Sequence, residues 1–245
     1  MQQTDFRTGE IRPIECFKEG WEAIKPQYWL IFAISMLGAI IGGISFYVLM
    51  GAMACGMFIC YFRAIDGETV EVEHLFRGFH YFWPSLLVTI LFVGPVIILF
   101  VLIYVPLLVT TFMGARMGQD ELFNFFIGTL ALEFVFAVAM VCLHTLLLFS
   151  YPLIVDRGLS GWSAVTTSAR AVLKNLKGVA GLWAAGFVAM ILGYLAFCVG
   201  LYFVIPLVVA ANVTAYRKVF PRLPGKEEGP PPPERYESLA KERQD

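Results

Sequence analysis

No charged residue occurs in the stretch 178–216, GVAGLWAAGFVAMILGYLAFCVGLYFVIPLVVAANVTAY, which is 39 residues long. A membrane-spanning helix needs roughly 20 apolar residues. The stretch is therefore too long for one span and has about the length of two short ones. Cys198-Val-Gly200, with Pro206 soon after, interrupts it and predicts a turn. We expect spans near 179–197 and 201–217.

A second charge-free run covers 26–62, which is 37 residues. The same length argument predicts two spans, and Gly42-Gly43 offers a turn between them. We expect these spans near 28–42 and 44–64.

The middle of the chain contains two further apolar runs. The run 81–115 carries no charge over 35 residues, and Pro106 weakens a helix near its end. The run 122–155 contains one acid, Glu133, and one histidine, His144. We expect spans there near 84–104 and 129–153.

A polar connection separates these two middle spans. It contains Arg116, Asp120 and Glu121, and Asp120 is suited to cap a short outer helix. With this connection on one side, all other Lys and Arg residues, 17 of 18, fall on the opposite side. The positive-inside rule then places both termini in the cytoplasm. The prediction is an all-α, polytopic transmembrane helical bundle of six spans arranged as three hairpins, over 1–220.

Composition agrees with this fold class. The chain is 58% hydrophobic and 15% charged, with mean hydropathy +0.72, whereas soluble domains carry about 25% charged residues. A net charge of −1 gives no electrostatic reason to expect a nucleic-acid partner. The polar start, 1–25, predicts no removable signal peptide. The Pro-rich end, 221–245, is polar and is expected to be disordered.

An amphipathic segment precedes each predicted hairpin. Each segment contains a glycine followed by an aromatic residue, at Gly20-Trp21, Gly78-Phe79 and Gly161-Trp162. We interpret the segments as interfacial helices on the cytoplasmic side, anchored by Trp21, Phe79 and Trp162. Their apolar stripes are predicted to comprise Ile14, Phe17, Trp21 and Ile24; Leu75, Phe76, Phe79 and Phe82; and Trp162, Val165, Ala169, Val172 and Leu176.

Glu133 is the one acid well inside a predicted span, which makes it a functional candidate. His144 follows eleven residues later, so the two side chains share a helix face and lie about 16 Å apart along the axis. A proton or cation path could use both. The alternative is structural, with Glu133 paired to Arg116 near the outer interface and His144 satisfied inside the bundle. The sequence leaves both interpretations open.

Catalytic and cofactor signatures are absent from the sequence: no Walker loop, GxSxG elbow, HExxH motif or pair of intramembrane acids occurs. The five cysteines form no CxxC pair, so disulfides and zinc are not expected. We predict no enzyme activity, no cofactor and no metal.

The order of features resembles that of uncharacterised bacterial six-span membrane proteins, which are similar in layout to the membrane domain attached to some glycerophosphodiester phosphodiesterases. The matching residues are Phe17-Lys-Glu-Gly-Trp-Glu-Ala-Ile-Lys25, Gly67-Glu-x-Val70 before Leu75-Phe-Arg-Gly-Phe79, Tyr151-Pro-Leu-Ile-Val-Asp-Arg-Gly158 with Trp162-Ser-Ala, Val199-Gly200, Pro206 and Ala215-Tyr-Arg217. The likeness covers about 14–220. Gly51-Ala52 stands where those families often show Gly-Pro. The resemblance implies a helical bundle in the bacterial inner membrane and brings no catalytic residues.

The leading functional expectation is a non-enzymatic scaffold, assembly factor or regulator. Its partners would be the lipid bilayer and other membrane proteins. The alternative is a small-solute or ion transporter or channel that uses Glu133 and His144.

Overall fold

The computed structural model describes residues 5–113, 116, 118–195 and 199–222, and this part of the chain is all-helical. The predicted tail 221–245 lies almost entirely outside the described residues, as does Cys198 in the predicted turn of the last hairpin. The elements in chain order are α1 (Pro13–Ile24), η2 (Lys25–Gln27), α2 (Tyr28–Ile44), α3 (Met50–Ile65), α4 (Glu73–Phe76), η3 (Arg77–Tyr81), α5 (Phe82–Met113), α6 (Gln119–Leu146), α7 (Ser150–Arg157), α8 (Gly161–Lys174), α9 (Leu176–Leu195) and α10 (Val199–Val219).

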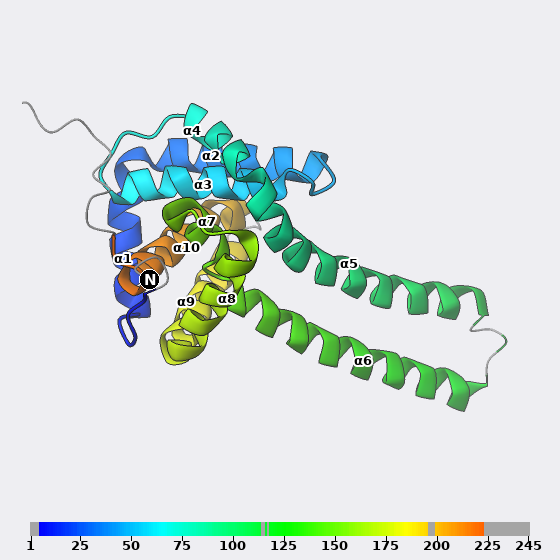
Figure 1. The fold of residues 1–245 in the computed structure, drawn as a ribbon. Coiled ribbons are helices and arrows are strands. Elements are labelled where there is room, and N and C mark those ends of the chain that lie inside the picture. The colour runs from blue at the N-terminus through cyan, green and yellow to red at the C-terminus, as the bar shows by residue number, and fades with distance from the viewer. Residues whose placement is uncertain (1–4, 114–115, 117, 196–198, 223–245) are drawn as a thin grey trace, which may run out of the picture.

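The helices form a packed bundle and one long arm (Figure 1). The arm consists of α6 and of α5 from Ile90 onward, and it extends past the turn between α2 and α3. Buried side chains on α5 are confined to its first turns, at Ser85, Val88 and Thr89. α6 has no buried residue along its 28 positions. The arm is therefore surrounded by solvent or lipid on most of its surface.

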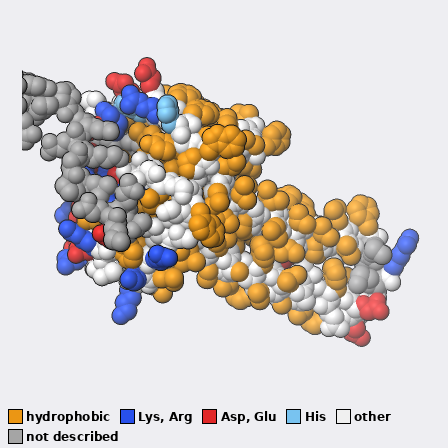
Figure 2. Space-filling model, in the orientation of Figure 1, with side chains coloured by type: hydrophobic (Ala, Val, Ile, Leu, Met, Phe, Trp, Pro, Cys, Tyr) orange, Lys and Arg blue, Asp and Glu red, His pale blue; other side chains and the backbone are white. Residues whose placement is uncertain are grey.

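Apolar side chains cover the arm in the face that Figure 2 shows, while Lys and Arg gather over the bundle end. Arg116 lies exposed at the far tip, between α5 and α6. In this view the Lys and Arg residues of the bundle and Arg116 lie at opposite ends of the structure.

Five helical stretches are long and apolar enough to cross a bilayer, and α3 is shorter, at 16 residues. The fold class, an all-helical chain compatible with a membrane, is confirmed, whereas six spans in three hairpins stay a prediction. The five stretches are Pro13–Ile44, Glu73–Phe112, Gln119–Arg157, Leu176–Leu195 and Gly200–Val219.

The predicted turn at Gly42-Gly43 is wrong. α2 continues through both glycines to Ile44, and the turn lies at 45–49. The Ser45 hydroxyl donates to the Gly42 carbonyl and accepts from the Leu49 amide. A Cβ on Gly42 would lie 3.4 Å from the Met50 Cα atom, which is an ordinary van der Waals contact.

Two predicted helix boundaries also differ from expectation. Pro106 lies inside α5, which runs to Met113 and not to 104. The predicted span 129–153 is broken, since α6 ends at Leu146 and α7 begins at Ser150. Pro152 explains this break, because its ring cannot follow an unbroken helix without clashing with the carbonyl four residues earlier.

Ser168 of α8 satisfies the backbone groups that this break exposes. Its hydroxyl donates to the Leu146 carbonyl at 2.7 Å and accepts from the Phe149 amide at 3.0 Å. Ser168 is fully buried, so both bonds form away from water. One side chain on α8 therefore fixes the angle between α6 and α7.

Candidate functional site

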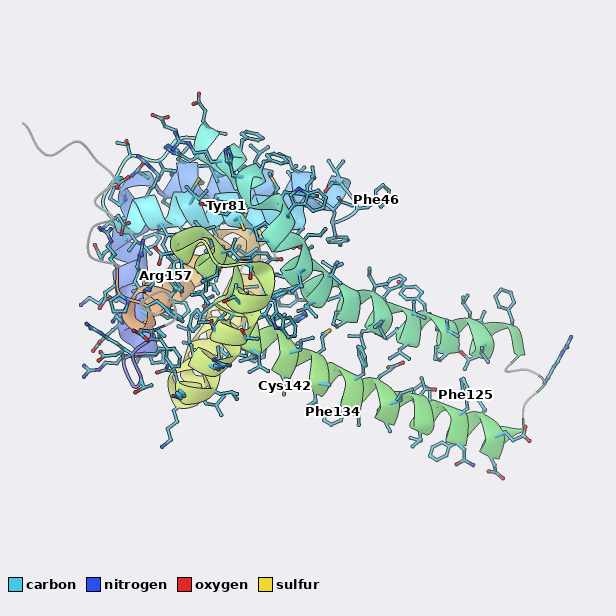
Figure 3. All side chains as sticks on the ribbon, in the orientation of Figure 1. Phe46, Tyr81, Phe125, Phe134, Cys142 and Arg157 are labelled. Atoms are coloured by element: carbon cyan, nitrogen blue, oxygen red, sulfur yellow. The ribbon has the colours of Figure 1, made fainter. Side chains whose placement is uncertain are left out.

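Glu133 lies in the middle of the arm, 14 residues after the first residue of α6, or about 21 Å along the axis. Its side chain is half-buried. Among the residues that the structure describes, Glu133 forms no hydrogen bond or ion pair. In particular, it does not pair with Arg116. Phe134 and Cys142 lie on the side of α6 that faces away from α5 (Figure 3), and Phe134 is 69% exposed. The middle of the arm thus combines an open apolar surface with an uncompensated acid.

His144 lies near the base of the arm, where its side chain contacts α5. Its Nε2 atom is 2.9 Å from the Phe92 carbonyl oxygen, and its ring stacks on the Phe92 ring at 4.8 Å. A carbonyl oxygen only accepts, so Nε2 carries the proton. Pro95 has no N–H and leaves the neighbouring Leu91 carbonyl without its helical donor. His144 therefore supports α5 where the helix is weakened.

The structure does not bring Glu133 and His144 together. Both lie on the single helix α6, and the Nε2 atom of His144 is bonded to the Phe92 carbonyl. The roles of Glu133 and His144 stay predictions.

A cluster of charged residues at the bundle end joins the ends of three helices. Arg217 of α10 donates to Asp156 of α7 at 2.9 Å and to Asp66, just after α3, at 3.3 Å. The Tyr216 hydroxyl also donates to Asp156, at 2.8 Å. All three charged side chains are mostly buried, with 12–16% of their area exposed. We call Asp66, Asp156 and Arg217 the ion-pair cluster.

Aromatic rings surround this cluster. The Arg217 guanidinium lies 4.3 Å from the centre of the Phe62 ring. The Tyr216 ring packs at 5.4 Å from Phe62, 6.0 Å from Phe149 and 5.0 Å from Phe220. Rings from α3, from the start of α7 and from α10 therefore shield the ion pairs from water, which strengthens them.

Two arginines extend the ion-pair cluster toward the end of the described chain. Arg157 donates to the Pro221 carbonyl at 2.6 Å and lies 5.8 Å from the centre of the Phe220 ring. Arg222 pairs with Asp66, and this hydrogen bond raises the pKa of Arg222 above its usual value. The residues that follow α10 are therefore held against α3 and α7.

The sequence analysis missed the ion-pair cluster, although a signal for it was present. Tyr61 precedes Asp66 by five residues, and Tyr151 precedes Asp156 by five. In both cases the tyrosine hydroxyl bonds a hydroxyl on an earlier helix, Ser35 at 2.9 Å and Thr89 at 3.2 Å. Ser35 and Thr89 already donate to carbonyls of their own helices, so the tyrosines are the donors.

The three glycine–aromatic pairs also share one geometry. A Cβ added to Gly20, Gly78 or Gly161 would overlap backbone atoms of α10, α3 or α5, respectively. The following aromatic residues, Trp21, Phe79 and Trp162, are 38%, 42% and 65% exposed. The short helices with Gly78 and Gly161 therefore each pack on the pair of long helices that precedes them in the chain. α1 has no preceding pair and packs on the last one, α9 and α10.

The faces that these short helices bury against the protein include only part of the apolar stripes that the sequence predicts for the membrane interface. Ile14 is exposed, and Cys16, Gly20 and Ile24 form the inner face of α1. α8 packs through small and hydroxyl-bearing residues, while Trp162 and Leu176 are exposed. Close helix approach selects small residues, so the larger apolar side chains are left outside.

Among the described residues, the polar groups named above form ion pairs and hydrogen bonds that join helices. No group of three or more His, Cys, Asp or Glu residues placed to hold a metal occurs within 5–113, 116, 118–195 and 199–222. Comparison with protein-family models, curated proteins and solved structures finds no match to this chain.

Proposed function

We propose that the protein is an integral membrane scaffold or assembly component whose α5–α6 arm binds other membrane proteins. The observation that carries the proposal is the absence of any buried side chain on α6. The bundle is held by contacts among the other helices and the base of α5, so most of the arm does not serve its packing.

Glu133 gives the arm a preferred partner chemistry. A carboxylate in the hydrocarbon core is costly unless it is paired, protonated or hydrated. No cation among the described residues compensates it. A partner helix that carries a hydrogen-bond donor or a cation at the same depth would supply the missing interaction.

Site-specific photo-crosslinking in intact membranes tests the scaffold proposal. A photoreactive residue at Phe134 should give a discrete protein adduct, and one at the equally exposed Phe187 of α9 should not. When Glu133→Gln is combined with the photoreactive residue at Phe134, the yield of the adduct should fall. Adducts of equal yield at both positions, or none at Phe134, would contradict a docking role for the arm.

A transporter or channel remains the second candidate, because Glu133 is unpaired and lies deep in the arm. It predicts a pH-dependent solute or ion flux in proteoliposomes that Glu133→Gln abolishes. Unchanged flux in that variant would count against this alternative.

The proposal includes location and topology. It places both termini in the cytoplasm and the chain in a bacterial inner membrane, as the resemblance to six-span bacterial families implies. The uneven distribution of Lys and Arg supports this orientation. Reporter fusions after 222 and within 114–118 should show opposite sidedness.

A further inference from the structure

The α8–α9 corner is cationic and contains no acid. From Arg157 to Lys226 the sequence has no Asp or Glu. Arg170, Lys174 and Lys177 are exposed there, and none of them forms an ion pair in the described part of the chain. The Lys174 ammonium lies 5.4 Å from the centre of the Phe6 ring, so the corner carries three positive charges of which only Lys174 has a partner, an aromatic ring.

The other short helix of similar length, α1, is different. Its exposed acids Glu15 and Glu19 pair with bases from outside the helix, Arg12 and Lys218. Positive charge is thus concentrated at the α8–α9 corner and balanced on α1.

The exposed face of α8 has an apolar edge and a cationic edge. At about 100° per residue, Trp162 and Leu173 lie about 20° apart around the helix. Arg170 and Lys174 lie on the same exposed side, about 80–120° from Trp162. Leu173 is 61% exposed. A helix with exposed apolar side chains beside cations is suited to the membrane interface, where the apolar edge enters the acyl boundary and the cations meet headgroups.

Local backbone geometry adds to the positive potential. Lys177 lies in the first turn of α9, at the positive end of the helix dipole, where a cation is unfavourable. The Asn175 side chain does not relieve this, because its oxygen accepts from the Gly9 amide and its nitrogen donates to the Arg7 carbonyl. No acid among the described residues therefore pairs with Lys177, and its charge is open to an anion from outside the chain.

We propose that the α8–α9 corner, defined by Trp162, Arg170, Leu173, Lys174 and Lys177, binds the headgroups of anionic phospholipids. This inference rests on the proposed insertion of the chain into a membrane. Each cation near an anionic membrane surface strengthens binding about fivefold at physiological salt. The three cations should act together and should lose their effect as salt screens them.

Lipid retention in nanodiscs tests this inference. The full chain is reconstituted in phosphatidylcholine with a minor share of phosphatidylglycerol, and the lipids retained after mild detergent extraction are quantified by mass spectrometry. We expect several-fold enrichment of phosphatidylglycerol at low salt, reduced at high salt. The variant Arg170→Gln/Lys174→Gln/Lys177→Gln should lose most of the enrichment.

A matched control removes the same charge elsewhere. Lys18, Lys25 and Arg77 are also exposed, and the variant Lys18→Gln/Lys25→Gln/Arg77→Gln should keep the enrichment. Equal loss in both variants, or no enrichment in the unaltered chain, would overturn the inference. Displacement of phosphatidylglycerol by millimolar inorganic phosphate would also overturn it, because the corner would then bind a free anion.

Carbonate extraction separates this inference from the proposal on which it rests. If the unaltered chain and both variants stay in the membrane pellet while the enrichment is missing, lipid selectivity alone fails. If the unaltered chain is released by carbonate, membrane insertion itself fails.

Discussion

Arg217 donates to Asp156 across 2.9 Å and thereby ties the end of α10 to the end of α7. The same guanidinium contacts Asp66 beyond α3. One arginine thus joins three segments that are far apart in sequence, and the Phe62 ring covers its face. This contact, rather than the apolar arm, fixes how the long helices are arranged at the bundle end.

Removing this arginine should destabilise the bundle. Arg217→Gln leaves Asp66 and Asp156 close together and less compensated, and we expect a loss of about 2–3 kcal/mol, less than for a fully buried pair. The free energy of unfolding can be measured by titration with sodium dodecyl sulfate. A double-mutant cycle with Asp156→Asn should show coupling between the two positions. Additive effects would mean that the 2.9 Å contact contributes nothing.

The glycines that precede the three aromatic residues should not tolerate a methyl group. Gly20→Ala, Gly78→Ala and Gly161→Ala each force backbone away from backbone, and we expect a cost of about 2 kcal/mol or more. Gly43→Ala and Gly128→Ala are the controls, since a Cβ there meets nothing within 4 Å. These control variants should be neutral or more stable by up to about 1 kcal/mol. Melting temperatures in detergent separate the two groups.

Ser168→Ala should loosen the junction between α6 and α7. It leaves the Leu146 carbonyl and the Phe149 amide without their side-chain partner, at a cost of about 1–3 kcal/mol. Thr166→Ala is the control, because the Thr166 hydroxyl bonds only carbonyls of its own helix. Hydrogen exchange of the 147–149 amides should rise in Ser168→Ala alone. Equal exchange in the two variants would assign no such role to Ser168.

Two changes of an acid to its amide should have opposite effects. Glu133→Gln removes an unpaired charge from an apolar helix, so detergent melting should stay constant or rise. Asp156→Asn removes a carboxylate that accepts from Arg217 and Tyr216, so melting should fall. A fall for Glu133→Gln would show that the carboxylate has a partner in the folded chain.

Membrane character was predictable because the cost of burying a charge in a bilayer applies to each stretch of sequence by itself. Long charge-free runs are visible in the sequence without knowledge of contacts, and five of the resulting helices have membrane length. Helix ends were less predictable. Pro106 lies within the continuous helix α5, whereas Pro152 follows a break whose backbone groups bond Ser168, a residue on another element.

The ion-pair cluster could not be predicted from local spacing alone. Asp66, Asp156 and Arg217 are far apart in sequence and meet only after the helices pack. The repeated interval of five residues from Tyr61 to Asp66 and from Tyr151 to Asp156 was the available clue. The glycine–aromatic pairs were recognised in the sequence, but only the structure shows that each glycine contacts a neighbouring backbone.

The unequal helix lengths have a consequence for the surrounding bilayer. At 1.5 Å per residue, α5 is about 48 Å long and α2 about 26 Å, compared with roughly 30 Å for the hydrocarbon core. The two helices cannot both match one flat membrane while standing upright. In a bilayer, this difference in length would require α5 to tilt steeply or the lipid around it to thicken. We therefore expect the protein to favour thicker bilayers and to deform thinner ones around its arm.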